Sequence, residues 1–227
     1  ARLEPLVRKC HIGNQVSFTF KQWEQSQNII LKRVTDTFSN ERIVVRSSSK
    51  GEDNWRFSNA GGFRSLLNVE SSDRNDVLNA IEAVICSYGD NHNHDDQILI
   101  QKCLQNVRMV GVVFTCGLET GSPYYRFNFD DQPQSTESVT SGTKCKLRTV
   151  IASRLETGKL HTIEPALVPV HDAVIELENL LGFDKLDIEF AIDDQDTVHV
   201  FQVRPITLDH SDYEVDIGSI EFSKSSL

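Results

Sequence analysis

Leu186-Asp187-Ile188-Glu189-Phe190 and Val200-Phe201-Gln202-Val203-Arg204-Pro205-Ile206-Thr207 are the two stretches that decide the fold of this chain. In both, apolar residues alternate with polar ones, which is typical of half-buried β-strands. The polar run 194–197 lies between them and has the composition of a turn. The pattern therefore predicts an antiparallel hairpin in which Glu189 lies opposite Gln202 and Asp187 lies opposite Arg204.

The predicted hairpin gathers its polar side chains on one face. Its other face is expected to carry the apolar residues Ile188, Phe190, Phe201 and Val203. Two carboxylates, an amide and a guanidinium are costly to bury together unless they hold something. They suit a divalent metal on hard oxygen ligands beside an anion on the arginine. A solvent-facing strand pair with a surface salt bridge fits the pattern equally well.

A second block, residues 43–69, combines a predicted strand with a loop that contains glycine. The strand ends at Arg46 and runs into serines, and Gly61-Gly62 and Ser65 follow in the loop. Glycine lets backbone N–H groups approach an anion closely, and arginine binds phosphate with two parallel hydrogen bonds. These are the parts of a phosphate-binding loop, although a Gly-Gly pair alone is more often a simple turn.

Five motifs occur in order between residues 17 and 207: VRSS-x-x-x-ED, S-x-AG-x-x-x-S-x-LNV, GVVFT, DIEF and FQVRPIT. Together they resemble the nucleotide-binding domain of phosphoenolpyruvate synthase, pyruvate phosphate dikinase and rifampin phosphotransferase, which has an ATP-grasp fold. The segments 124–131 and 139–142 look most like a smaller branch of kinases from capsular polysaccharide clusters, among them glutamine kinases. The resemblance implies an α+β fold of two lobes with a nucleotide cleft between them.

The resemblance also implies ATP and Mg²⁺ as cofactors and gives roles to the residues that match the motifs. Arg46 and Arg204 would contact the ATP phosphates and take part in catalysis. Gly61 would belong to a mobile loop above the phosphates, the Ser58–Gly62 loop, and Ser65 would offer a hydroxyl contact nearby.

Three further positions match the family. Gln101 would lie beside the adenine on a hinge strand, and Glu189 and Gln202 would contact the metal and the nucleotide. Asp187 is expected either to join them or only to orient Arg204.

By the same resemblance, the whole enzyme would use Mg-ATP to phosphorylate a histidine on a swivelling domain, releasing AMP and phosphate. It would then pass the phosphoryl group to a small acceptor, pyruvate-like or an amino acid. The expected partners are thus the nucleotide and the phosphohistidine and acceptor domains of the same full-length protein. Nothing here matches the T-S-H-x-A segment that carries the histidine, so the isolated chain is expected to be inactive. An ATP-sensing module and a degenerate non-catalytic nucleotide-binding module are the alternatives.

The sequence departs from the family at two places. Where the larger enzymes have an arginine after GV-x-FT, this chain has Cys116-Gly117, so the role of that arginine is open. A phosphate-binding lysine in a Gly-Gly-Lys-like turn is also missing near the N-terminus. The first residues resemble those just after that turn, so the chain is expected to be a piece of a larger protein.

Composition restricts the partners and the compartment. The 227 residues are 39% hydrophobic and 25% charged, which is ordinary for a globular domain, and no apolar run approaches the length of a membrane span. The formal net charge of −10 argues against nucleic acid or an anionic membrane as partner. Five scattered cysteines without a C-x-x-C pair favour free thiols and a cytoplasmic location.

Periodicity and capping residues outline the elements. Thr19 is a predicted N-cap for a helix that reaches Ser39, and a second helix is expected from Asp73 to a terminating Gly89. Strands are predicted at 97–101, 111–115, 124–129 and 147–153, and a further helix at 170–181 before Gly182. We expect an N-terminal lobe at 1–93 with the phosphate-loop motifs, a C-terminal lobe at 94–208 with the hairpin, and a tail or linker at 209–227.

Overall fold

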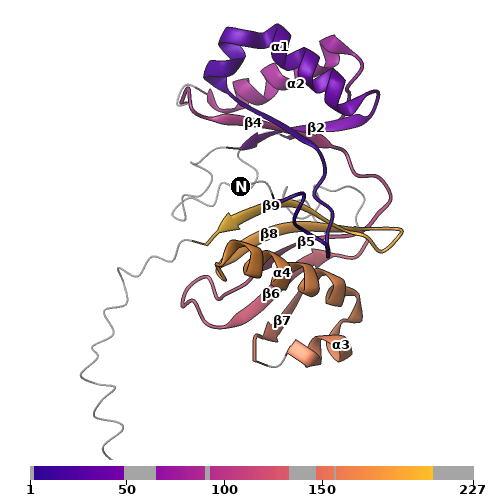
Figure 1. Cartoon of the computed structure of the whole chain (residues 1–227), viewed down its shortest axis with the longest axis vertical. Coiled ribbons are helices and arrows are strands. Elements are labelled where there is room, and N and C mark those ends of the chain that lie inside the picture. The colour runs from indigo at the N-terminus through magenta and orange to yellow at the C-terminus, as the bar shows by residue number, and fades with distance from the viewer. Residues whose placement is uncertain (1–2, 49–64, 90–92, 133–146, 156, 207–227) are drawn as a thin grey trace, which may run out of the picture.

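The computed structural model describes residues 3–48, 65–89, 93–132, 147–155 and 157–206. These residues form two lobes, each built on its own antiparallel sheet with helices against one face (Figure 1). The α+β class and the two-lobed organisation that the sequence predicts are confirmed. None of the described helices is both long enough and apolar enough to cross a membrane.

The first lobe is a four-stranded sheet in the order β1-β4-β2-β3, covered by two helices. Its elements are β1 (Gln15–Thr19), α1 (Phe20–Phe38), β2 (Arg42–Ser48), β3 (Ser65–Glu70), α2 (Arg74–Ser87) and β4 (Gln97–Lys102). Ile43, Val45 and Ile100 are fully buried and point from the sheet towards the helices. Because side chains alternate along a strand, the residues between them point to the other face, which is turned towards the second lobe.

The ends of both helices in this lobe are fixed by their sequence. The Thr19 hydroxyl accepts the N–H of Gln22 and the Gln22 side chain accepts the N–H of Thr19, which is a complete capping box. The Asp73 carboxylate caps α2 by accepting the N–H groups of Asn75 and Asp76. Gly89, just beyond α2, has φ 65°, a conformation that favours glycine. The predicted starts of both helices are confirmed.

The boundary between the lobes differs from the expected one. Strand β4 pairs with β1 and β2, so it completes the first sheet although its residues lie beyond position 93. Ile98 and Ile100 of this strand are fully buried in the core of the first lobe. The first sheet therefore includes residues up to Lys102, beyond the division expected at 93–94.

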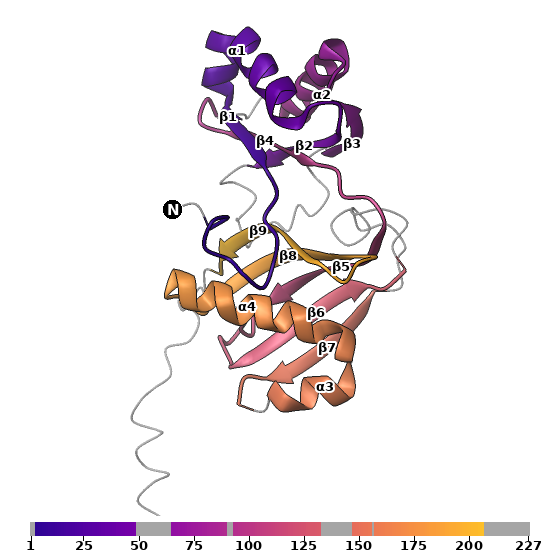
Figure 2. The same ribbon diagram turned by 45° about the vertical axis from the view of Figure 1, so that its right-hand side comes forward.

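The second lobe is a five-stranded sheet in the order β7-β6-β5-β8-β9. Its strands are β5 (Val107–Phe114), β6 (Tyr124–Asp130), β7 (Arg148–Ser153), β8 (Leu186–Asp193) and β9 (Val198–Pro205). Helices α3 (Leu160–Ile163) and α4 (Val168–Leu181) and two short 3₁₀ turns, Thr157–Lys159 and Pro165–Leu167, complete it. Helix α4 lies across one face of the sheet (Figure 2) and buries Val174 and Leu177 there.

The start of the chain packs against the second lobe rather than the first. Val7 belongs to the core of the second lobe. The N–H of His11 donates to the carbonyl of Val198 and the N–H of Val200 donates to the carbonyl of His11, at 2.7 and 2.9 Å. The backbone N–H groups of Arg8 and Lys9 bind the Glu176 carboxylate on α4. These contacts place residues 7–11 against the second lobe, although the expected N-terminal lobe at 1–93 includes them.

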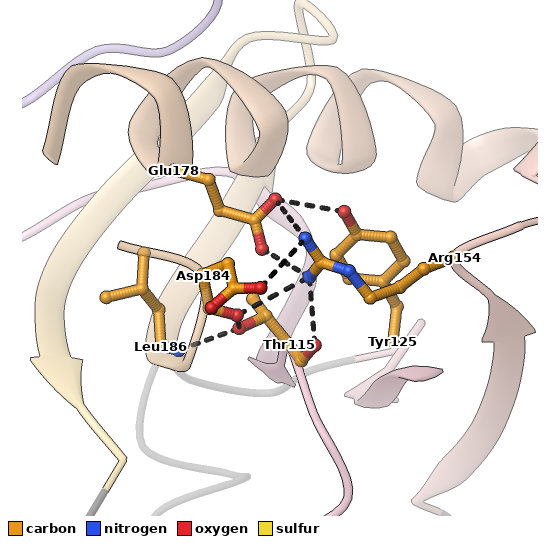
Figure 3. Close-up of polar contacts among 6 residues, drawn as sticks. All are labelled: Thr115, Tyr125, Arg154, Glu178, Asp184 and Leu186. Carbon is orange, nitrogen blue, oxygen red and sulfur yellow. Dashed lines mark hydrogen bonds and ion pairs between the residues drawn. The ribbon is translucent and has the colours of Figure 1, made fainter. Parts of the chain in front are cut away.

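A buried ion pair ties the sheet of the second lobe to α4 (Figure 3). The Arg154 guanidinium, just after β7, donates to both oxygens of Glu178 at 2.6 and 3.1 Å, and to the carbonyl of Thr115 at 3.0 Å. It also lies over the ring of Tyr125, whose hydroxyl donates to Glu178. Burial, followed by the Glu178 charge, raises the pKa of Tyr125, so the phenol remains a donor.

We predict that Glu178→Ala lowers the free energy of unfolding by about 3 kcal/mol, because it leaves the largely buried Arg154 with only the longer ion pair to the exposed Asp184. Glu41→Ala is the control, since the Glu41–Lys102 pair is exposed and should contribute less than about 1 kcal/mol. Urea unfolding of both variants measures the difference. Equal losses in the two variants would show that the buried pair contributes no more than a surface pair.

His171 is a buried base in the same region. It is 6% exposed, its ring meets the Tyr125 ring edge to face at 4.9 Å, and its Nε2 has no hydrogen-bond partner among the described residues. Burial lowers the pKa of His171 below 6.5, although the nearby Asp172 and Glu178 carboxylates oppose the shift. The folded state therefore holds this imidazole neutral at pH values where the unfolded chain takes up a proton.

We predict that His171 makes the fold less stable as pH falls below about 6.5, because the unfolded state then binds more protons than the folded state. His171→Leu should therefore lose less stability between pH 7 and pH 5 than the wild type does. His94→Leu, at an exposed position in the first lobe, is the control and should keep the wild-type slope. The measurement is urea unfolding across this pH range, and unchanged slopes in His171→Leu would contradict the prediction.

Candidate functional site

The β8–β9 hairpin has the predicted pairing. Glu189 lies opposite Gln202 and Asp187 lies opposite Arg204 in an antiparallel pair of strands. All four residues are partly buried. Since directly opposed residues share a face of the sheet, the hairpin presents two acids, an amide and a guanidinium together.

A β-bulge decides which face these residues occupy. The register shifts between Glu189 and Phe190, so Phe190 pairs with Val200 and Phe201 is the extra residue. Val198 and Val200 are buried in the core before the bulge, and Val203 packs against the same core after it. The expectation that Phe201 shares the apolar face is wrong, because the inserted residue changes the alternation along β9.

The turn of the hairpin is held by Asp193. Its carboxylate accepts the N–H groups of Gln195 and Thr197, both at 2.9 Å, and lies 2.8 Å from Nε2 of His199. Burial raises the pKa of Asp193, but the hydrogen bonds from His199 and the turn outweigh it and hold that pKa below its ordinary value. Asp193 thus remains an acceptor that fixes the end of the hairpin.

Arg46 comes from the sheet of the first lobe. It lies in β2, paired with Ser65 of β3 and with Leu99 of β4. Its neighbours Val45 and Ser47 are buried on the helix side of the sheet, so the Arg46 side chain points to the face that is turned towards the second lobe. Gln101 follows Leu99 by two residues and shares this face.

Arg46 joins the two lobes. Its Nη1 donates to Oε2 of Glu189 at 2.8 Å, and its Nη2 lies 3.3 Å from Oε1 of Glu189 and 3.0 Å from Oε1 of Gln202. The Arg46 and Glu189 side chains are only 18% and 17% exposed. Nearby, Nε2 of Gln101 donates to the carbonyl of Phe201, the bulged residue, at 3.1 Å.

Of the seven residues predicted for the site, Arg46 contacts both Glu189 and Gln202. A fourth, Gln101, binds the carbonyl of Phe201, which precedes Gln202 in the chain. Ser65 lies beside Arg46 by strand register, and Arg204 lies on the face of the hairpin that carries Gln202. Gly61 and the Ser58–Gly62 loop lie outside the described residues.

The oxygen atoms at this site suit a cation. Side-chain oxygens of Glu189 and Gln202 converge on one guanidinium, so a positive group already lies where they point. Mg²⁺ prefers oxygen ligands and is usually held by one or two carboxylates together with substrate phosphates. Among the described residues, no group of three or more His, Cys, Asp or Glu side chains could hold a metal by itself. The residues thus fit a cation that shares its coordination with a bound phosphate.

The sequence does not show which residues of other strands share the face that carries Glu189 and Gln202. Beyond the hairpin, Val112 and Phe114 of β5 and Arg126 and Asn128 of β6 continue the same face. The alternation in Tyr124–Asp130 indicates which residues lie opposite the core, but only the strand order shows that they adjoin Glu189.

No protein-family model matches the chain, and no curated protein matches it. Solved structures with a similar backbone include the D-alanine-D-alanine ligase from Coxiella burnetii, at 12% identity over 86% of this chain and 43% of that chain, with a TM-score of 0.46. The VanG D-Ala:D-Ser ligase from Enterococcus faecalis matches at 11% identity over 87% of this chain and 48% of that chain, with a TM-score of 0.47.

A third similar structure is the macrocyclase MdnC bound with precursor peptide MdnA from Microcystis aeruginosa MRC. It matches at 10% identity over 94% of this chain and 55% of that chain, with a TM-score of 0.44. The chain spans about half the length of these proteins. These are partial overlaps of backbone at low sequence identity, and neither a reaction nor a substrate is inferred from them.

We predict that Arg46 and Glu189 are energetically coupled by about 1–2 kcal/mol, because both are largely shielded from water and share two hydrogen bonds. A double-mutant cycle with Arg46→Ala and Glu189→Ala, followed by urea unfolding, measures the coupling. The exposed pair Lys102–Glu41 is the reference cycle and should give less than about 1 kcal/mol. Additive effects of the two alanine substitutions would show that the contact does not hold the lobes together.

Proposed function

We propose that this chain is an ATP-grasp domain that binds Mg-ATP between its two lobes, as part of a larger phosphotransferase. The observation that carries the proposal is the contact of Arg46 from one lobe with Glu189 and Gln202 from the other. A guanidinium suited to binding phosphate and a carboxylate suited to binding a cation are thus in contact between two separately built sheets. The ordered motifs that resemble the phosphoenolpyruvate synthase family support the same assignment.

Nucleotide binding would replace the present partners of Arg46 and Glu189. Arg46 would give up the Glu189 carboxylate for a phosphate oxygen, which forms hydrogen bonds of the same bidentate kind. Glu189 and Gln202 would then be available to hold Mg²⁺, which would supply charge neutralisation to the bound phosphates. Arg204, on the same face of the hairpin, would provide a second phosphate contact.

Gln101 has a suitable place for recognition of the base. It is the next-to-last residue of β4, after which the chain leaves the first sheet for β5 of the second. Its amide already bridges the lobes through the Phe201 carbonyl. An adenine ring bound between the lobes could form hydrogen bonds with this amide and with the backbone of β9.

The reaction we propose is the one that the resemblance implies. The larger protein would transfer the β-phosphoryl group of ATP to a histidine on a mobile domain, while water takes up the γ-phosphoryl group, so that AMP and phosphate are released. The histidine would then pass its phosphoryl group to a small acceptor such as a pyruvate-like acid or an amino acid. Phosphoryl transfer depends mainly on positioning and charge stabilisation, for which guanidinium groups and a metal site are suited. Arg46 and Arg204 would fill that role, with Ser65 beside Arg46.

We predict that Glu189→Ala and Arg204→Ala, each in the full-length protein, reduce ATP-dependent histidine phosphorylation at least about 100-fold, because each removes a charged contact to the reacting phosphates. The assay follows label from β-labelled ATP into acid-labile protein phosphate. Arg108→Ala is the control, since Arg108 pairs with Asp196 away from the site. Labelling of both site variants at the wild-type rate would make these residues structural.

A further inference from the structure

The face of the sheet that carries the polar hairpin residues extends across the other strands of the second lobe. Along one row of cross-strand pairs, Glu189 is followed by Val112, Asn128 and Thr149. Along the next row, Asp187 is followed by Phe114, Arg126 and Ile151. Directly opposed residues of antiparallel strands share a face, so all of these side chains lie on the face opposite α4.

Two apolar residues separate the hairpin from a second polar group. Val112 and Phe114 are half-buried and lie between the acids of β8 and the polar residues of β6. Two strand spacings make Arg126 about 10 Å distant from Asp187, and Asn128 about 10 Å from Glu189. A ligand of that length could lie over the apolar strip with one end at each polar group.

Arg126 differs from the other arginines that the structure describes. The Arg126 side chain is exposed and makes no hydrogen bond or ion pair to any described residue, whereas each of the other described arginines makes a hydrogen bond, an ion pair or another interaction. The contrast is sharp with Arg148 on the adjacent strand, which binds both Asp131 and Glu164. A surface arginine whose role is to pair with a neighbouring acid would be expected to resemble Arg148.

Asn128 adds hydrogen-bond donors beside Arg126. The Thr149 hydroxyl donates to Oδ1 of Asn128 at 2.9 Å, which satisfies the acceptor and orients the amide. The two N–H groups of Asn128 then remain for a ligand, on the same face as Arg126 and two residues along the same strand. The guanidinium also has donors only, so the pair fits an oxyanion and not a cation.

We propose that Arg126 and Asn128 form a second anion-binding subsite, which holds a phosphate or carboxylate group of a ligand lying across Val112 and Phe114. Its place in the reaction rests on the proposed function: the anion is either the terminal phosphate of the nucleotide or an oxyanion of a second substrate. The subsite itself does not depend on that function, because the same donors bind inorganic phosphate in its absence.

The direct test is a titration of the 227-residue chain with inorganic phosphate, followed through the NMR signals of the arginine Nε–Hε and asparagine side-chain amide groups. The Arg126 and Asn128 signals, assigned with Arg126→Gln and Asn128→Ser, should shift saturably with phosphate and not with chloride at equal ionic strength. The signal of Arg108, whose charge is paired with Asp196, should not saturate. A non-saturable shift at Arg126, or one equal to that at Arg108, would make Arg126 a solvated surface residue and overturn the proposal.

Nucleotide affinities then identify the source of the anion. Arg126→Gln should weaken phosphate binding at this site at least about tenfold, and Arg126→Lys should restore only part of it because the planar fork is lost. If the loss also appears with a non-hydrolysable ATP analogue but not with ADP, the subsite holds the terminal phosphate. If both nucleotides bind Arg126→Gln as they bind the wild type, phosphate should bind together with ADP as a separate oxyanion. Failure of the wild type to bind any nucleotide would count against the proposed function, while the phosphate titration would still decide the subsite.

Discussion

The contact of Arg46 with Glu189 and Gln202 is the interaction on which the arrangement of this molecule depends. Each lobe has its own sheet and its own hydrophobic core, so neither needs the other to bury its apolar residues. What joins them at the site is a guanidinium that satisfies oxygen atoms from two strands of the opposite lobe. At 17–18% exposure these charges are neither in bulk water nor fully desolvated. Their attraction therefore stabilises the contact, while separation of the pair does not leave either charge fully desolvated.

That contact exists because of one extra residue in β9. Before Phe201 the core-facing residues are Val198 and Val200, and after it the core-facing residue is Val203. Without the bulge, uninterrupted alternation would turn Gln202 and Arg204 towards the core below α4, where their polar groups would lack partners. The bulge also leaves the Phe201 carbonyl free of the ladder, and Gln101 from the first lobe binds it. One irregularity therefore both orients the polar face and provides a second link between the lobes.

Elements whose signals are local could be predicted from the sequence. The caps at Thr19 and Asp73 depend on residues within one helical turn. The pairing of Glu189 with Gln202 depends on the short turn that joins two consecutive strands. Strand β3 does not follow from the sequence pattern, because the adjacent Leu66 and Leu67 break the alternation of apolar and polar residues. In the structure, the register shifts at this point and Asn68 has φ 59°. The apolar run in β4 predicts a buried strand but not the sheet that it joins, which follows only from its pairing with β1 and β2. Likewise, no sequence pattern shows that Arg126 adjoins Phe114, since that follows only from the strand order.

Comparison of the two shielded arginine–glutamate pairs separates a structural role from a functional one. Arg154 and Glu178 belong to the same lobe, and their remaining groups are occupied by Tyr125 and by backbone carbonyls (Figure 3). A ligand could not replace either partner without leaving several buried groups unsatisfied. Arg46 and Glu189 belong to different lobes with separate hydrophobic cores, so replacement of either partner by a phosphate or a cation would leave both cores intact. An arginine–glutamate pair therefore stabilises the fold where all of its partners belong to one lobe. It forms a candidate binding site where its partners come from both lobes.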